Sequence, residues 1–139
     1  MKKRVFVLSL IALALLIAAC ASKTAENEKV IKTAPAANNL SVALATNNGV
    51  LKHGDTEFML TFSDTSGKPV DVGAVALTFH MPQMGTMAEM NDTATFVTTE
   101  TPGVYRGKAK IEVAGEWQVK ITYDGPKGRG QATFPITAQ

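Results

Sequence analysis

Four of the chain's six methionines lie within ten residues, in the stretch His80-Met81-Pro82-Gln83-Met84-Gly85-Thr86-Met87-Ala88-Glu89-Met90. They recur at every third position, directly after a histidine. Thioether sulfur is a soft, neutral ligand that suits Cu(I) or Ag(I). Methionine also fills irregular apolar gaps and forms adaptable binding surfaces. The segment therefore has three interpretations: a soft-metal site, part of the core, or an exposed contact surface for a protein partner.

The candidate ligands are the methionines themselves, with the adjacent imidazole as a further donor. Met81, Met84 and Met87 are the main candidates for a Cu(I) site, and His80 and Met90 are auxiliary candidates. Thioethers have no proton to lose, so a site made of them alone would hold metal over a wide pH range. A contribution from His80 would make binding depend on pH, because only the neutral imidazole is a ligand.

The residues between these methionines indicate a loop. Pro82 and Gly85 are both unfavourable inside a helix, so we expect the segment to connect two strands at one end of the fold. Met81 continues the apolar alternation of residues 75–79. It is therefore expected to face the core, with His80 on the opposite face of the strand. The next two methionines are then the better candidates for an exposed pair, and the third ligand stays open.

The rest of the sequence shows the period-two pattern of β-strands, most clearly in residues 117–123. Turn signals separate about seven such runs, near residues 40–46, 56–63, 73–81, 93–99, 104–113, 116–123 and 130–137. This pattern predicts an all-β domain, a single antiparallel β-sandwich of immunoglobulin-like architecture. Pro135 favours an edge position for the last strand, because proline cannot donate to a ladder.

The first 39 residues differ in composition from the rest. A basic start and an apolar run in residues 1–19 predict a secretory signal peptide. The sequence Leu16-Ile17-Ala18-Ala19-Cys20 resembles the lipobox of bacterial lipoproteins, which implies that Cys20 is acylated, with palmitate for example, and becomes the mature N-terminus. Residues 20–39 are poor in large apolar side chains and are expected to form a flexible tether. This leaves residues 40–139 as the folded domain.

Charge and residue content argue against several function classes. Without the basic residues 2–4, the chain has 11 basic and 12 acidic side chains, which offers no basic surface for nucleic acid. Cys20 is the only cysteine, so no intrachain disulfide or thiolate metal cluster is expected. His53 and His80 are the only histidines. The sequence has no Gly-x-Ser-x-Gly motif, paired carboxylates or Gly-rich phosphate loop. We therefore expect a protein that is not an enzyme.

Four short runs resemble the YtkA-like/FixH-like domain family in their order and spacing. They are Ser66-Gly67-Lys68-Pro69-Val70, Met81-Pro82-Gln83-Met84-Gly85, Pro102-Gly103-Val104-Tyr105 and Gly115-Glu116-Trp117-Gln118-Val119. The resemblance covers about residues 40–137 and implies a small exported or membrane-anchored β-sandwich. It also implies a link to copper, through respiratory oxidase assembly in FixH-type proteins or heavy-metal efflux in related domains.

Carried over to this chain, the family pattern implies Met81, Met84 and Met87 as metal ligands. Many members have a histidine directly after the Met-Pro-x-Met-Gly glycine, whereas this chain has Thr86. That difference removes one ligand of the family type. FixH-type proteins also carry a transmembrane anchor where this chain is expected to use a lipid, so its partner is expected to differ.

These features predict a lipoprotein of the bacterial cell envelope that faces the periplasm. The outer membrane is favoured, because Ala21 stands where an aspartate often marks inner-membrane retention. The lipid would hold the protein on the membrane, and the methionine loop would bind Cu(I). The expected role is that of a copper carrier or an accessory to oxidase assembly or metal efflux, with a copper-handling membrane protein as partner. The alternative is a metal-free interaction or assembly module, in which the methionines are core and contact surface.

Overall fold

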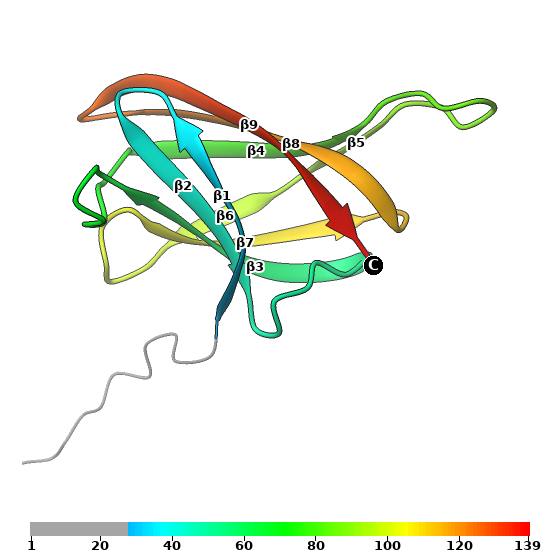
Figure 1. Ribbon diagram of the computed structural model, residues 1–139, viewed down its shortest axis with the longest axis horizontal. Coiled ribbons are helices and arrows are strands. Elements are labelled where there is room, and N and C mark those ends of the chain that lie inside the picture. Colours follow the sequence, from blue (N-terminus) through cyan, green and yellow to red (C-terminus); the bar gives the residue numbers. More distant parts are fainter. Residues whose placement is uncertain (1–27) are drawn as a thin grey trace, which may run out of the picture.

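The computed structural model describes residues 28–139 and shows two antiparallel β-sheets packed face to face (Figure 1). The strands are β1 (Lys29–Ala36), β2 (Leu40–Thr46), β3 (Gly54–Ser63), β4 (Ala74–Met81), β5 (Met90–Thr93), β6 (Thr95–Thr98), β7 (Val104–Ile111), β8 (Gly115–Gly125) and β9 (Gly128–Ala138). The five-stranded sheet has the order β1-β2-β3-β7-β6, and the four-stranded sheet has the order β5-β4-β8-β9. The predicted all-β sandwich is confirmed. Within these residues we find no helix able to cross a membrane.

The core lies between the inner faces of the two sheets. Alternate side chains of a strand point to the same face, so the apolar alternation of the sequence builds this layer. Phe58 of β3 and Phe79 of β4 meet edge to face, with ring centroids 5.8 Å apart, and so join the two sheets. Trp117 is fully buried, and its Nε1 donates to the Val113 carbonyl oxygen at 3.1 Å. Pro135 lies in β9, an edge strand as predicted.

The fold begins earlier than the composition indicates. The prediction of a tether over residues 20–39 is wrong for residues 29–36, which form β1 and pair with β2. An edge strand contributes few side chains to the core, and Ala34 is the buried one in β1. Backbone pairing can therefore order a stretch that is too polar to be recognised by hydrophobic pattern. The predicted signal peptide, Cys20 and residues 20–27 lie outside the described residues.

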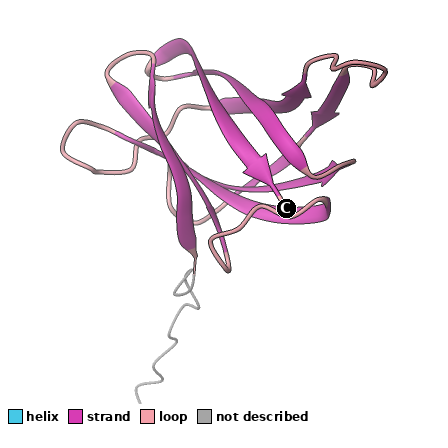
Figure 2. Ribbon diagram, turned by 45° about the vertical axis from the view of Figure 1, so that its right-hand side comes forward, coloured by secondary structure: helices cyan, strands magenta, loops and turns pink. Residues whose placement is uncertain are grey.

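The predicted strand near residues 93–99 is divided between the sheets. Residues up to Thr93 belong to β5, and Thr95 begins β6 in the other sheet. Ala94 marks the crossing, and its N–H donates to the Leu77 carbonyl oxygen of β4 at 3.0 Å. With β1 and β5 added, the sandwich has nine strands where about seven are predicted. β5 completes a hairpin with β4, and Figures 1 and 2 show this hairpin projecting beyond the other strands.

Candidate functional site

The four methionines form two cross-strand pairs of the β4–β5 hairpin. Met81 lies opposite Met90 in the ladder, and Met84 lies opposite Met87 at the tip. The tip pair is closed by two backbone hydrogen bonds, from Met84 N–H to Met87 O at 3.2 Å and from Met87 N–H to Met84 O at 2.9 Å. The turn between them has two residues, and the first, Gly85, has φ of 57°. Glycine adopts this conformation at little cost, so the sequence sets the tight turn that brings the two methionines opposite each other.

The two pairs are separate positions on the hairpin. The tip pair, Met84 and Met87, stands three residues beyond Met81 and Met90 on both strands, with no change of register. At 3.3–3.4 Å per residue this is about 10 Å along the strands. The ladder is interrupted between the pairs, where Pro82 has no N–H to donate. The backbone therefore does not gather the four methionines into one ligand cluster.

Burial distinguishes the two pairs. Met81 is 2% exposed, as its place in the strand alternation predicts, and Met90 packs half-buried against the core. The Met81 methyl group fills the space beside Gly115, where an added Cβ would lie 3.1 Å from it. Met84 and Met87 are 53% and 44% exposed. The inner pair thus belongs to the packing of the sandwich, and the outer pair is accessible to a ligand or partner.

His80 lies on the outer face of the four-stranded sheet, in register with Asn91 and Gln118. Its Nδ1 is 2.8 Å from Asn91 Oδ1, and the Asn91 amide nitrogen donates to Glu89 Oε1 at 3.0 Å. An amide oxygen only accepts, so in the neutral imidazole this contact would place the proton on Nδ1 and the lone pair on Nε2. His80 precedes Met84 by four residues, about 13 Å along an extended strand. The predicted combination of His80 with the tip methionines is therefore not assembled by the backbone.

Asn91 and Glu89 are residues that sequence reasoning missed. Asn91 contacts the imidazole directly, and Glu89 accepts from the Asn91 amide and so holds it in place. Their relation to His80 depends on the hairpin register, which follows from the two-residue turn at Gly85. That turn is the signal that could have revealed them. Across residues 28–139, no three or more His, Cys, Asp or Glu side chains are grouped in a way that could hold a metal ion.

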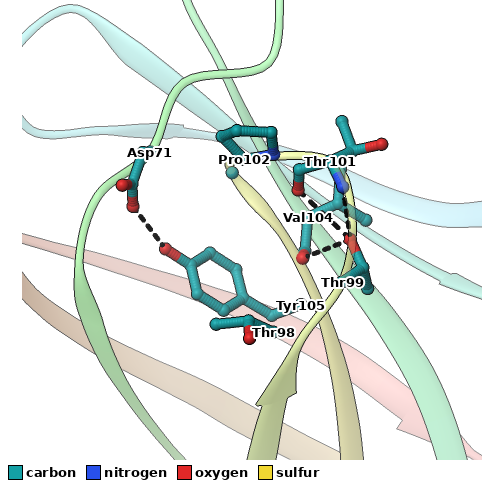
Figure 3. A pocket seen from close by; sticks show the side chains of 8 residues that line it. Asp71, Thr98, Thr99, Thr101, Pro102, Val104 and Tyr105 are labelled. Carbon is teal, nitrogen blue, oxygen red and sulfur yellow. Dashed lines mark hydrogen bonds between the residues drawn. The ribbon is translucent and has the colours of Figure 1, made fainter.

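A shallow pocket lies on another part of the fold, beside the segment that enters β7 (Figure 3). The Tyr105 hydroxyl reaches across it, 3.2 Å from Asp71 Oδ1 and 3.0 Å from the Gly73 carbonyl oxygen. It also accepts from the Val72 N–H at 3.4 Å. Burial, together with the Asp71 carboxylate, raises the pKa of Tyr105. These bonds connect β7 to the chain entering β4, so we assign Tyr105 a structural role.

The fold and the hairpin define an antiparallel two-sheet β-sandwich domain that presents a methionine pair at the end of a projecting hairpin. The chain belongs to the YtkA-like family, whose family model matches residues 35–122. The match includes the whole β4–β5 hairpin and confirms the YtkA-like resemblance. Comparison with curated proteins gave no match, and comparison with solved structures gave none either.

Proposed function

We propose that this protein binds Cu(I) at the tip of the β4–β5 hairpin, through Met84 and Met87. In this proposal it is a cell-envelope lipoprotein, anchored through Cys20 and facing the periplasm. It carries copper or assists oxidase assembly or metal efflux, and it acts by binding rather than by catalysis. Copper is its cargo, received from one partner and passed to another.

The observation that carries the proposal is the pairing of Met84 with Met87 across a two-residue turn. Directly opposed residues of an antiparallel pair have Cβ atoms about 4.5–5.5 Å apart. Side chains as flexible as methionine can bring two sulfurs to one ion from that distance. Both side chains are accessible, and soft neutral sulfur matches the preference of Cu(I). The tip therefore suits a two-coordinate site.

Such a site would leave room on the metal for a further ligand. Met81 is buried and Met90 is half-buried, about 10 Å back along the strands. His80 stands farther back still. A metal held by two exposed thioethers can accept its next ligand from another protein, which suits transfer rather than storage. The proposal accordingly assigns Met84 and Met87 as ligands, and leaves Met81, Met90 and His80 as auxiliary positions outside the tip.

The test is a Cu(I) competition titration against a chromogenic chelator under reductant. All chains carry Cys20→Ser, because an unacylated thiol would itself bind Cu(I). The informative variant is Met84→Leu/Met87→Leu, which keeps apolar size and removes both sulfurs. We expect it to weaken binding at least about 100-fold, or roughly 2.7 kcal/mol. Gln83→Ala, a change in the same tip, is the matched control and should leave the affinity unchanged. Equal affinity in the double leucine variant would exclude the site.

A second candidate function is metal-free protein recognition. It is favoured by one observation: Met84 and Met87 are two of the four large hydrophobic residues that are exposed within residues 28–139. Flexible methionine surfaces adapt to partners. The double leucine variant separates the two functions, because leucine preserves an apolar contact. A module of this kind would keep its partner after the substitution and in the presence of a copper chelator.

A further inference from the structure

Each sheet of the sandwich has two edge strands, and three of the four edges are protected against pairing with another chain. An open edge presents free N–H and C=O groups, and proteins guard it with lysine, proline, bulges or acidic residues. β1 contains Lys32, Pro35 and a register shift. β5 is short and carries Asp92. β9 contains Pro135 and is partly covered where Ala37 donates to the Gln131 carbonyl oxygen at 3.2 Å.

The fourth edge, β6, has none of these devices except its shortness. Its sequence lies in the uncharged run Thr93-Ala94-Thr95-Phe96-Val97-Thr98-Thr99. β-Branched and aromatic residues of this kind favour strand pairing. Val97 is 61% exposed, the highest value among the large hydrophobic residues of the described chain. β6 pairs with β7 on one side, and the sheet ends on the other.

The hydrogen-bond pattern shows which backbone groups face this free edge. Thr99 N–H donates to the Val104 carbonyl oxygen at 3.3 Å. Thr99 and every second residue before it along the strand therefore point their N–H and C=O groups towards β7. Groups alternate in direction along a strand of an antiparallel pair. Val97 therefore also bonds to β7, while the N–H and C=O groups of Phe96 and Thr98 point away from the sheet.

We propose that a second copy of this chain pairs antiparallel with β6, around a two-fold axis at Val97. Phe96 N–H would donate to the Thr98 carbonyl oxygen of the second copy, and Thr98 N–H to its Phe96 carbonyl oxygen. The symmetry repeats both bonds, which gives about four in all. Val97 would face its own counterpart as a non-hydrogen-bonded pair, whose Cα atoms are about 4.5 Å apart. The two five-stranded sheets would then form one continuous sheet.

Two features of the fold favour a second copy as the occupant. The register is self-complementary, since the outward groups lie symmetrically on either side of Val97, as an isologous interface requires. The nearest charges in the same cross-strand row are the two Arg106 side chains, one from each copy. With strands about 4.8 Å apart, their backbones are about 14 Å from each other. This exceeds the Debye length of about 8 Å at physiological salt, so their repulsion is screened.

The outer face of the sheet also continues across the axis. Val30, Ala45, Met59, Arg106 and Val97 lie in one register row over all five strands. Val30 at the opposite end of this row is 59% exposed, almost as much as Val97. It therefore provides a matched control for substitutions on β6. The interface is small, so association is expected to be weak and to depend on protein concentration.

The test is sedimentation velocity of the chain without residues 1–19, which contains every strand, in a Cys20→Ser background that prevents disulfide dimers. Protein concentrations from about 10 µM to about 1 mM cover the range in which a weak interface forms. Over this range, the chain without substitutions in β6 should shift from monomer to dimer. Val97→Lys should abolish the shift, and Val30→Lys should leave it unchanged. An equimolar mixture of Val97→Lys and Val97→Glu should associate again, because the two side chains would face each other across the axis. Unchanged melting temperatures establish that the variants fold.

Three results would overturn the proposal. The first is a chain that stays monomeric throughout this range. The second is an equal effect of Val30→Lys and Val97→Lys, which would indicate a general effect of surface charge. The third is a lysine–glutamate mixture that fails to associate although each variant is folded.

Discussion

Met81 and Met90 face each other across β4 and β5, and the first is buried in the sandwich while the second closes its end half-exposed. This relationship separates the methionines that pack within the fold from the tip pair, which we propose binds copper. Met81→Ala should lower the free energy of unfolding by about 2–5 kcal/mol, the usual cost of truncating a packed methionine. Urea unfolding followed by the fluorescence of Trp117, the single tryptophan, measures it.

Met84→Ala is the control for that substitution. Its side chain is half-exposed at the hairpin tip, so its effect on stability should stay within about 0.5 kcal/mol. The proposed copper site requires the reverse order for Cu(I) affinity, with the larger loss at Met84. A substitution at Met84 that destabilised the fold as much as Met81→Ala would contradict the division of the four methionines into two pairs.

The turn at Gly85 should control the tip without controlling the fold. No atom lies within 4 Å of a Cβ added at Gly85, so Gly85→Ala acts through its positive φ and not through a clash. The strain, about 1–2 kcal/mol, is expected to open the turn and weaken Cu(I) binding by up to about tenfold. The chelator competition titration measures this loss.

Thr86→Ala provides the comparison at the second turn position, which does not have a positive φ. It should leave the affinity unchanged. The melting temperature should remain the same in both variants, because the tip projects beyond the packed strands (Figure 2). Loss of affinity in both variants would mean that turn geometry does not determine binding.

The alkaline titration of the protein should report both of its tyrosines. Burial raises the pKa of Tyr105 and of Tyr123 above the ordinary value of 10.0. In the unfolded chain these phenols ionise near pH 10, while in the folded chain they ionise only at higher pH. The stability they contribute is therefore complete below pH 10 and falls as the pH rises through the folded-state pKa values.

Tyrosinate absorbance near 295 nm, measured with and without denaturant, tests this expectation. The native midpoint should lie above that of the unfolded chain, because the phenols are partly withdrawn from water. A native midpoint at or below the unfolded one would contradict the burial and hydrogen bonding of Tyr105 and Tyr123.

Strand β1 should contribute to stability although its composition is that of a linker. A chain that begins at Leu40 loses the ladder between β1 and β2, the buried Ala34, and the bond from the Tyr123 hydroxyl to the Ala37 carbonyl oxygen at 2.7 Å. We expect its melting temperature to fall by at least about 10 °C relative to a chain that begins at Glu28, since roughly 1 kcal/mol corresponds to 4–8 °C in a small domain. Equal melting temperatures would show that β1 is dispensable.

The sequence predicts the strands that face the core and misses those that are held mainly by backbone pairing. In β8 the alternation of apolar and polar residues is complete, because one face of a central strand is buried along its length. β1 buries one side chain, and β5 is only four residues long, with the sequence Met-Asn-Asp-Thr, in which no apolar position repeats. Their position at sheet edges results from tertiary pairing, which no local pattern encodes.

The candidate site, like the edge strands, could be predicted from the sequence only in part. Alternation correctly places Met81 in the core, because it extends the pattern of β4. The pairing of Met84 with Met87, and of His80 with Asn91, depends on the register of the hairpin. Register is fixed by turn length, and the sequence predicts the turn at Gly85 only as part of a loop. Side-chain types therefore indicate candidate ligands, while the pairing of these candidates depends on the backbone.

The early start of β1 leaves only a short segment between Cys20 and the folded domain. Eight residues separate Cys20 from Lys29, and a fully extended chain of that length spans about 30 Å at most. With Cys20 as the proposed lipid attachment, the start of β1 at Lys29 stays within about one bilayer thickness of the membrane surface. Figures 1 and 2 show the start of β1 at the lower edge of the fold and the hairpin tip at the upper right, far from it. Held in this way, the protein would direct its methionine pair away from its own membrane and offer it to partners that approach from the space beyond.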